Sequence, residues 1–294
     1  VGYDKQMATI VSKRKSKNTY YYLNHHASGR QKEIYLGKTI PKNIEELKKK
    51  LVLDFYREEW NPKLEQIQKR FVQNRKKMPK SVIEQEINNF AINFTYHTQK
   101  IEGSSLTRLD TKRLLVEGIT PKNRPKEDMV ETELAQQIFF EMLTHQKSLS
   151  LNSVRYWHTK MFNKTKIDLA GEIRDYSDIT VTNSKAKFPS GDQVFDQVVN
   201  FFKWYNSVKS TINPVEVAAM VHLKFVSIHP FGDGNGRISR LMMNCVLDEN
   251  SYPMLNIEYS QRERYYKTLE QSQIKNDDFI FLKWFMKTYI SKNK

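Results

Sequence analysis

The sequence predicts a mainly α-helical protein with a small β-containing region near its N-terminal end. Most of the chain carries apolar residues at three- and four-residue spacing, the pattern of helices that bury one face. Ten glycines and nine prolines are few for 294 residues, which suits a helical protein. Strand-like patterns are limited to residues 19–37 and 179–189.

The composition predicts a soluble, cytoplasmic protein. With 39% hydrophobic residues, the chain can bury a core in one large or two modest domains. Its single cysteine, Cys245, lies in an apolar helical run, which argues against a disulfide framework and a metal-thiolate site. We expect no membrane span and no hydrophobic signal segment, because no apolar stretch is long enough.

The positive charge is concentrated at one end of the chain. The formal net charge is +15. Residues 1–80 contain 20 Lys and Arg against 8 Asp and Glu, whereas residues 81–294 contain 28 against 25. The basic character therefore belongs to the N-terminal region.

Residues 19–37 are predicted to form a β-hairpin. Two strand-like runs, 19–23 and 32–37, flank the turn signals Ala27-Ser28-Gly29-Arg30. Tyrosines interleaved with Lys and Arg could stack on bases and neutralise phosphates, so one interpretation is nucleic-acid contact. The alternatives are a basic sheet that packs on the helical domain, with tyrosines as β-formers, and attraction of an acidic protein.

Residues 43–78 are predicted as two helices separated at Asn61-Pro62, because proline removes a helix hydrogen bond. The charged run 75–80 is the predicted boundary between an N-terminal region, 1–80, and a C-terminal domain, 81–294. The tetrapeptide Ser81-Val82-Ile83-Glu84 matches a capping box and predicts a long helix over residues 81–103. Further helices are predicted at residues 106–117, 127–146, 154–162, 194–205, 214–228, 238–247, 260–273 and 277–290.

Residues 229–240, His-Pro-Phe-Gly-Asp-Gly-Asn-Gly-Arg-Ile-Ser-Arg, combine groups suited to a polyphosphate. The glycines let successive N–H groups point into one concavity at the start of a helix, where the helix dipole also favours an anion. Asp233 is a hard oxygen ligand suited to Mg²⁺. Arg237 and Arg240 lie on one helical face and can reach the same phosphates. His229 could accept a proton from an attacking hydroxyl.

A purely structural interpretation of the same residues is a glycine-rich loop that joins two core helices, with His229 satisfied inside the fold. A metal site formed by His229 and Asp233 is a further alternative. It is disfavoured because Pro230 and the glycines break the helix that would put both residues on one face. The complete string favours phosphate binding.

Residues 229–240 match in full the signature of the Fic (Fido) family, His-Pro-Phe-x-Asp-Gly-Asn-Gly-Arg-x-x-Arg. The resemblance implies a helical bundle with a β-hairpin flap, and transfer of AMP from ATP to a hydroxyl side chain of a protein. Phosphotransferase relatives alter the position of Gly234, so the glycine favours nucleotidyl transfer. The implied roles are His229 as general base, Asp233 as Mg²⁺ ligand, Arg240 as ligand of the γ-phosphate, and Phe231, Gly232, Gly234, Asn235, Gly236 and Arg237 around the nucleotide.

Residues 98–103 resemble the inhibitory motif of autoinhibited Fic proteins, Ser/Thr-x-x-x-Glu-Gly/Asn, at Thr98, Glu102 and Gly103. The resemblance implies that Glu102 pairs with Arg240, which would otherwise bind the γ-phosphate, and a carboxylate is a suitable partner for a guanidinium. The alternative is a solvated charge at a helix end. In some family members this glutamate also positions a water that removes AMP.

The second strand-like region, with Ile179, Thr180 and Val181, resembles the flap of the family, which implies that it holds a target segment by strand addition. The alternative is a β-loop that only covers the core.

Three residues further along the chain resemble nucleotide-contacting positions of Fic enzymes. Tyr265 and Tyr266 resemble the tyrosine pair at the adenine site, and Asn244 falls where relatives place a polar residue near the nucleotide. Core packing is the alternative for all three.

Three functional hypotheses follow. The first is a protein adenylyltransferase that uses ATP and Mg²⁺ and modifies a Ser, Thr or Tyr hydroxyl, with Glu102 as an inhibitor. The second is an enzyme that mainly removes AMP through Glu102. The third is a nucleic-acid-binding regulatory adaptor in which the Fic fold senses a nucleotide. The target protein, self-modification and a homodimer are left open.

Overall fold

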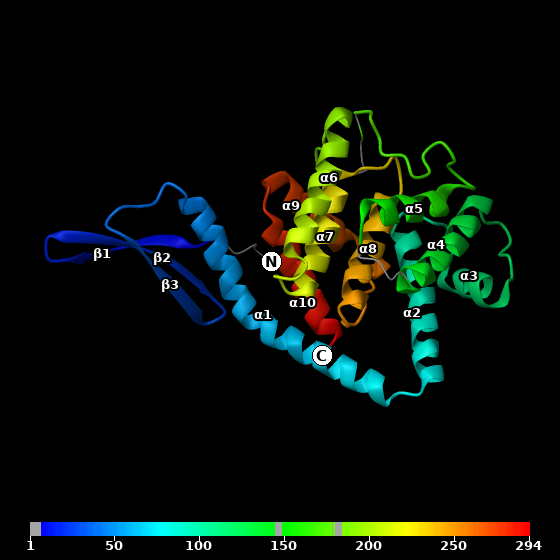
Figure 1. Ribbon diagram of the computed structural model, residues 1–294, viewed down its shortest axis with the longest axis horizontal. Helices are drawn as coiled ribbons and strands as arrows, with labels where there is room; N and C mark the ends of the chain where they lie inside the picture. Colours follow the sequence, from blue (N-terminus) through cyan, green and yellow to red (C-terminus); the bar gives the residue numbers. More distant parts are fainter. Residues whose placement is uncertain (1–6, 145–148, 178, 180–183) are drawn as a thin grey trace. The chain divides into compact units, whose positions relative to one another are not determined.

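The computed structural model describes residues 7–144, 149–177, 179 and 184–294. It is mainly helical, as predicted, with one small sheet near the N-terminal end (Figure 1). Its packing divides the chain into two compact units, one up to Gln66 and one from Ile67 to Lys294. The predicted domain boundary after residue 80 stays a prediction. None of the helices in the described part of the chain has both the length and the apolarity to cross a membrane.

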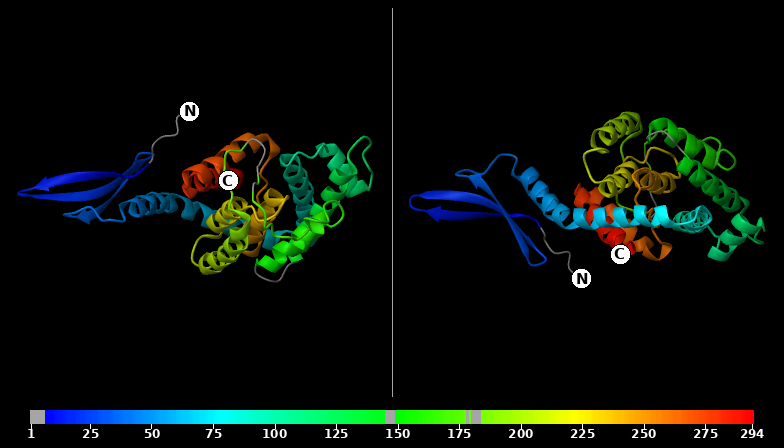
Figure 2. Two further views of the ribbon diagram at one scale, coloured as in Figure 1. Left: turned by 90° about the horizontal axis from the view of Figure 1, so that it is seen from above. Right: turned by 60° about the horizontal axis from the view of Figure 1, so that its bottom comes forward.

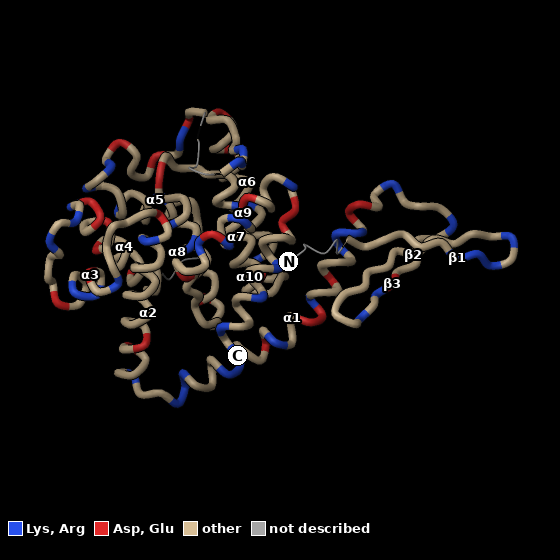
Figure 3. The backbone as a smooth tube through the Cα atoms, turned by 180° about the vertical axis from the view of Figure 1, so that it is seen from behind, with Lys and Arg blue, Asp and Glu red and all other residues tan. Residues whose placement is uncertain are grey.

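The N-terminal unit contains a three-stranded antiparallel sheet in the order β1 (Thr9–Lys15), β2 (Asn18–Ala27) and β3 (Arg30–Gly37). The predicted hairpin is β2–β3, in which Ala27 pairs with Arg30 across the two-residue turn. Both turn residues, Ser28 and Gly29, have positive φ angles of 51° and 73°, as a tight hairpin requires. Strand β1 was not predicted, because its run Thr-Ile-Val-Ser-Lys-Arg-Lys is mostly polar. Figure 3 shows the basic residues of this unit.

The prediction of two helices over residues 43–78 is wrong, since α1 runs without a break from Ile44 to Lys77 with Pro62 inside it. Buried residues on both sides of the proline, Trp60 and Leu64, continue one apolar stripe. Tertiary burial of that stripe outweighs the loss of a single backbone hydrogen bond.

Helix α2 (Lys80–Ile101) begins one residue before the predicted capping box, and that box does not form. The N-cap is Pro79, with no side-chain hydrogen bond, and the Pro79 carbonyl accepts from the N–H groups of Val82 and Ile83. The helix ends at Ile101, two residues before the predicted end at 103, and is followed by Glu102 and by Gly103, which has a φ of 103°.

The larger unit is organised around two central helices, α7 (Pro214–Ile228) and α8 (Asn235–Glu249), which pack against each other. Helices α6 (Gly191–Val208) and α10 (Asp278–Lys292) pack on α7, and α9 (Arg262–Lys275) packs on α10. On the other side, α2, α4 (Lys126–Thr144) and α5 (Leu151–Phe162) pack on α8 (Figures 1 and 2). The remaining short elements are α3 (Arg108–Lys112), the π-turn η1 (Arg113–Glu117) and the 3₁₀ turn η2 (Tyr259–Gln261).

The expected flap region only partly belongs to the described residues. Thr180 and Val181 lie outside them, and Ile179 is half-buried. The described residues between Gly171 and Ser190 form no strand. The backbone N–H of Lys185 donates to the Glu270 carboxylate, 2.6 Å away, which attaches this segment to α9.

Candidate functional site

The loop between α7 and α8 reverses the chain and brings residues 229–240 to one end of the central helix pair. Helix α7 ends at Ile228, and the φ of 53° at the C-cap residue, His229, lies in the left-handed region. Pro230 cannot continue the helix because it has no N–H. Helix α8 begins after Gly234, which has a φ of 76° and whose β-carbon, if present, would lie 2.4 Å from the Phe162 ring. Glycine is therefore required at position 234 by both conformation and space.

Phe231 and Asn235 close this loop from the inside. The Asn235 side chain accepts from the Phe231 N–H at 2.9 Å and donates to the Phe231 carbonyl at 2.8 Å. Phe231 is buried and stacks on His158, with ring centroids 3.8 Å apart. The side chains of Phe231 and Asn235, which were expected at the nucleotide, thus hold the loop in shape. The part of these two residues that can face a ligand is the backbone.

His158, on α5, supports the loop between α7 and α8 through hydrogen bonds. Its sequence position on an apolar helix face did not indicate this role. Its Nδ1 accepts from the Gly171 N–H at 2.9 Å, so Nε2 carries the proton and donates to the Asp233 carbonyl at 3.0 Å. Burial lowers the pKa of His158 to about 4. The imidazole is therefore neutral at physiological pH and serves as a fixed bridge between two backbone segments.

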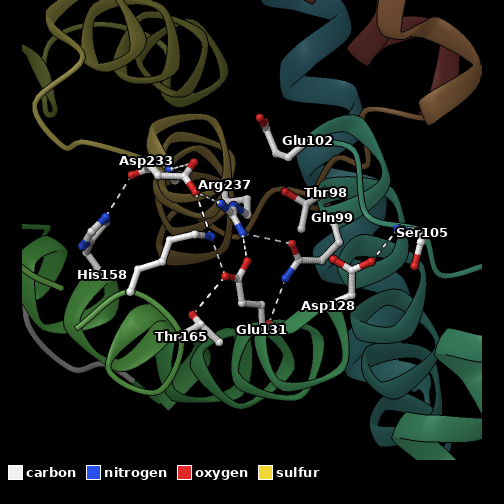
Figure 4. A network of polar contacts seen from close by, with 12 residues as sticks. Thr98, Gln99, Glu102, Ser105, Asp128, Glu131, His158, Thr165, Asp233 and Arg237 are labelled. Atoms are coloured by element: carbon white, nitrogen blue, oxygen red, sulfur yellow. Dashed lines mark hydrogen bonds and ion pairs between the residues drawn. The ribbon is translucent and has the colours of Figure 1, made fainter. Parts of the chain in front are cut away.

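Asp233 lies among cationic groups (Figure 4). Its Oδ2 is 2.9 Å from Lys166 Nζ and 3.0 Å from Arg237 Nη2, and its Oδ1 accepts from the Gly234 N–H at 2.5 Å. Burial would raise the pKa of Asp233, but the charge of Arg237 and the hydrogen bond from Lys166 hold it at about 2. The carboxylate is ionised at neutral pH and remains 41% exposed, so it is accessible to a ligand.

Arg237 is committed to a buried network and does not extend into open space. Its guanidinium is 4% exposed and pairs with both Glu131 and Asp233, and Gln99 accepts a further hydrogen bond at 3.3 Å. Glu131, on α4, also binds Lys166 at 2.6 Å. Sequence reasoning missed Glu131, whose place on a predicted helix gave no sign that it would face α8.

Arg240 meets the end of α2, which lies 138 residues earlier in the chain. Its Nη2 is 2.5 Å from Glu102 Oε1, and its Nε donates to Thr98 Oγ1 at 2.8 Å. A third contact runs from Nη1 to the Tyr265 hydroxyl, 3.1 Å away. The guanidinium is buried at 2% exposure, while Glu102 is 26% exposed. The structure therefore brings together the pair that the resemblance implied.

Glu102 also lies against the first turn of α8. A β-carbon on Gly236 would be 2.3 Å from Glu102 Oε1, which is too close for two non-bonded atoms. The carboxylate therefore fits here because residue 236 is glycine. The first N–H groups of a helix have no partner within the helix, and its dipole favours negative charge there. The carboxylate thus occupies the position at which an anion is favoured.

His229 is half-buried, and both its ring and its backbone make close contacts. Its ring lies 4.5 Å from the Phe188 ring, and its carbonyl accepts from Arg174 Nε at 2.8 Å. Burial lowers the pKa of His229 to about 4, opposed by a hydrogen bond with the Val226 backbone. The imidazole is therefore unprotonated at neutral pH and can accept a proton.

Arg174 holds together the segments around His229, a role that its place in the sequence did not indicate. The buried guanidinium also donates to the carbonyls of Tyr176 and Pro189, each at 2.8 Å, and to that of Ile228 at 3.4 Å. Its own N–H donates to the Pro230 carbonyl at 2.9 Å. It joins the end of α7 to the segments that precede α6.

The three residues expected near the adenine have structural contacts. Tyr265 is fully buried, and its hydroxyl lies between Arg240 and His222 Nε2. The Tyr266 hydroxyl donates to the Ile101 carbonyl at 3.3 Å. Asn244 accepts from the Leu255 N–H and donates to the Leu255 carbonyl. Tyr265 and Tyr266 are thereby tied to the Glu102–Arg240 contact, whereas Asn244 holds the loop after α8.

A cavity of about 490 Å³ adjoins the residues just before His229. It lies between α6, α7, α9 and α10 and ends at Ser227 and Ile228. Its lining mixes polar and apolar side chains, with Lys187, Gln197, Asn200, Trp204 and Gln273 among the residues. None of its lining residues belongs to 229–240, so it is separate from the anion-favouring turn.

Comparisons with known proteins point to one family. The model of the Fic/DOC family matches residues 148–247. Proteins named protein adenylyltransferase Fic from Drosophila ananassae and Drosophila melanogaster are each 31% identical over 179 residues, which is 60% of this chain. The same alignments cover 35% and 36% of those proteins, so the chain spans about a third of their length.

Solved structures share the fold. A Fic domain containing signaling protein from Bacteroides thetaiotaomicron aligns with a TM-score of 0.71 and 24% identity, over 79% of this chain and 95% of that one. Fic-1 (aa134–508) from C. elegans aligns with a TM-score of 0.69 and 22% identity, over 85% of this chain and 73% of that one. Residues 148–247 therefore match the Fic/DOC family, and the chain shares the fold of these Fic domain structures.

Proposed function

We propose that this chain is a protein adenylyltransferase, which transfers AMP from ATP to a Ser, Thr or Tyr hydroxyl of a protein, and that Glu102 inhibits it. The observation that carries the proposal is the Glu102 carboxylate, which contacts Arg240 and lies against Gly236 at the start of α8. A carboxylate held by a guanidinium at a helix N-terminus occupies the kind of site that binds a phosphate. The names of the Drosophila relatives support the reaction class.

The triphosphate would lie on the first turn of α8, with its γ-phosphate on Arg240 in place of Glu102. Gly234 and Gly236 leave the backbone of this turn free of side chains. Arg237 would contribute its charge from within the buried network, since both Glu131 and Asp233 already bind it. This modifies the expected direct contact between Arg237 and phosphate.

Asp233 is the residue suited to hold Mg²⁺. Its carboxylate is ionised and partly exposed, and the described residues contain no cluster of three or more His, Cys, Asp or Glu side chains that could enclose a metal. One carboxylate together with substrate phosphates is the arrangement that Mg²⁺ commonly uses. The ion would neutralise phosphate charge when it is bound with ATP.

His229 would act as the general base. The hydroxyl oxygen of the target attacks the α-phosphorus, its proton moves to the neutral imidazole, and the bond between the α-phosphorus and the bridging oxygen breaks to release pyrophosphate. The low pKa of His229 keeps the imidazole unprotonated before the attack. Arg174 fixes the backbone on both sides of this residue.

Removal of AMP from a modified protein is a second candidate for the same site. The Glu102 carboxylate is 26% exposed at the edge of the site, where it could orient an attacking water. In this alternative, the loss of Glu102 abolishes release of AMP from a modified target.

The test is incubation of the purified protein with ATP labelled at the α-phosphate, followed by mass spectrometry for an added adenylate. We expect Glu102→Gly to increase labelling of added proteins or of the chain itself by at least 10-fold, because Arg240 becomes available to the γ-phosphate. The matched control is Glu117→Gly, since Glu117 likewise precedes a glycine of positive φ, Gly118, at the end of a helical segment.

The second variant tests the base. His229→Ala in the Glu102→Gly background should abolish labelling while ATP still binds. Equal labelling with and without His229 would contradict the mechanism. Equal labelling by wild type and Glu102→Gly, together with loss of AMP release from a modified target, would favour the reverse reaction.

A further inference from the structure

The outer face of the N-terminal sheet carries three tyrosines that the proposed reaction does not use. Tyr20 and Tyr22 alternate along β2, and Tyr35 on β3 pairs with Tyr22. The ring centroid of Tyr35 lies 5.3 Å from that of Tyr22 and 6.2 Å from that of Tyr20. Tyr35 is 58% exposed. We call these three residues the tyrosine face.

The opposite face of the sheet is occupied by the first part of α1. His25 on β2 contacts the ring of Phe55 edge-on, with centroids 4.8 Å apart. Arg30 and Lys32 on β3 pair with Glu59 and Glu58 of α1 at 3.0 and 2.5 Å. The sheet is therefore supported from one side, and the tyrosine face is the side that α1 does not cover.

Cations accompany the tyrosine face. Lys13 Nζ lies 4.3 Å from the Tyr22 ring centroid, and Lys38 Nζ lies 6.0 Å from that of Tyr20. Three further exposed cations are Arg14 and Lys15 at the end of β1 and Lys17 between β1 and β2. Figure 3 shows basic residues at this end of the sheet. Residues 9–38 contain seven Lys and Arg and a single acidic residue, Glu33, which pairs with Lys13. The excess of positive charge in residues 9–38 favours an anionic partner.

We propose that the tyrosine face binds single-stranded nucleic acid, with bases stacked on Tyr35 and its neighbours and with phosphates along the basic β1–β2 turn. Aromatic side chains in a positively charged groove or surface are the recurrent means of holding unpaired bases. A sheet backed by a helix keeps such rings in fixed positions. This site is independent of the proposed adenylyl transfer.

The combination of rings and charges distinguishes this partner from two others. A duplex keeps its bases stacked internally and would use the cations without the rings, and an acidic protein likewise needs charge but no aromatic platform. The exposed Tyr35 ring is therefore the discriminating residue.

The experiment measures fluorescence polarisation of labelled 20-nucleotide dT and U oligomers with the full chain over a salt series. We expect binding that weakens with salt, with a slope of log K against log[salt] of about −3 if about four phosphates are neutralised, since single strands give roughly −0.7 per contact. Tyr35→Ala should weaken binding on the order of 10-fold, whereas Tyr35→Phe, which keeps the ring, should not.

Charge controls complete the test. Lys15→Ala combined with Lys17→Ala should reduce the salt slope by about 1.4. Lys49→Ala combined with Lys50→Ala, which removes the same charge from exposed positions of α1, should leave the slope unchanged. His229→Ala should have no effect on binding.

Three results would overturn the proposal: no binding of either oligomer at low salt, equal affinity for a duplex of the same length, or equal affinity of Tyr35→Ala and wild type. The dT and U arms distinguish DNA from RNA. Circular dichroism of each variant establishes that the sheet is intact.

Discussion

Gly236 and Glu102 are in such close contact that a β-carbon on Gly236 would lie 2.3 Å from Glu102 Oε1. The same β-carbon would lie 3.1 Å from Arg240 Nη1. A fit this close between a helix backbone and a distant carboxylate makes position 236 a direct probe of the Glu102–Arg240 contact.

We predict that Gly236→Ala lowers the free energy of unfolding by about 1–3 kcal/mol in the wild type, because the added carbon displaces Glu102. In the Glu102→Gly background the cost should shrink or change sign, since alanine is favoured over glycine in helices by up to about 1 kcal/mol. Urea unfolding of wild type, Gly236→Ala, Glu102→Gly and the double variant measures the difference in a double-mutant cycle. The clash of the added carbon with Arg240 is present in both backgrounds, so it cancels. Additive effects would show that Glu102 does not lie where the structure has it.

Arg174 should be a positioning residue for His229. It donates to the carbonyls on both sides of the α7 terminus and to Pro189. We expect Arg174→Met to reduce labelling in the Glu102→Gly background by more than 10-fold with nearly unchanged ATP affinity, because the first turn of α8, on which we propose that the triphosphate lies, is left intact. Arg174→Lys should restore part of the rate.

The matched control for Arg174 is Arg155→Met. Arg155 donates to the Gly171 carbonyl at 2.9 Å and pairs with Glu172 at 3.6 Å, so its contacts in the described part of the chain are with residues other than His229. Single-turnover labelling and equilibrium binding of ATP separate the two effects. A parallel loss of ATP affinity in Arg174→Met would argue for general loosening of the site and against a positioning role.

Stability should decrease on mild acidification. Burial lowers the pKa of His158 and His229 to about 4 and that of His222 to about 3. Because each folded-state value lies below the unfolded value of about 6.5, the unfolded chain binds more protons between about pH 6.5 and 4. These histidines should therefore lower the free energy of unfolding as the pH falls through this window, and they are opposed in its lower part by Asp248 and Glu249, whose pKa values burial raises.

Urea unfolding at pH 7, 6 and 5 measures this slope. His222→Phe should flatten this slope by up to one proton. Asp233 has a lowered pKa of about 2, so its contribution is lost only below about pH 4 and does not mask the effect. An unchanged slope in His222→Phe would contradict the buried, neutral imidazole.

Glu131 should be critical for stability. It lies at the centre of the network that holds Arg237 and Lys166. Glu131→Gln leaves two cations facing Asp233 alone, and breaking a buried ion pair costs about 3–5 kcal/mol. We expect a loss of that order in urea unfolding, and a smaller loss for Glu141→Gln, a more exposed carboxylate on the same helix that binds Lys160.

Much of the fold could be predicted because its helices have strong apolar periodicity. Helix α7 was predicted at its observed bounds, 214–228, where Asn213 and Pro214 mark the start and Pro230 the end. The errors in predicted helix boundaries arose where tertiary packing or a neighbouring residue outweighed a local sequence signal. Pro62 did not end α1, and Ser81 did not cap α2, because burial and the preceding Pro79 determined those helices.

The candidate site was predictable only in the parts that are local in sequence. The glycines and the two arginines of 229–240 could be recognised from their spacing, and the motif of Glu102 from its resemblance. The supports provided by Glu131, His158 and Arg174 come from other elements, and no short-range pattern indicates which side chains will meet. Likewise, Phe231 and Asn235 resemble ligand-facing residues but fold inward to close the loop.

Arg240 retains three donor contacts that do not involve Glu102: Nε to Thr98 Oγ1, Nη2 to the Thr98 carbonyl and Nη1 to Tyr265. A change of rotamer at Glu102 alone would thus uncover an arginine that is already oriented, with no unwinding of α2. Rotamer changes of partly exposed side chains take picoseconds to nanoseconds, whereas helix rearrangements take microseconds or longer. Activation by this route would be limited by how strongly a competing anion binds and not by how fast the backbone can move.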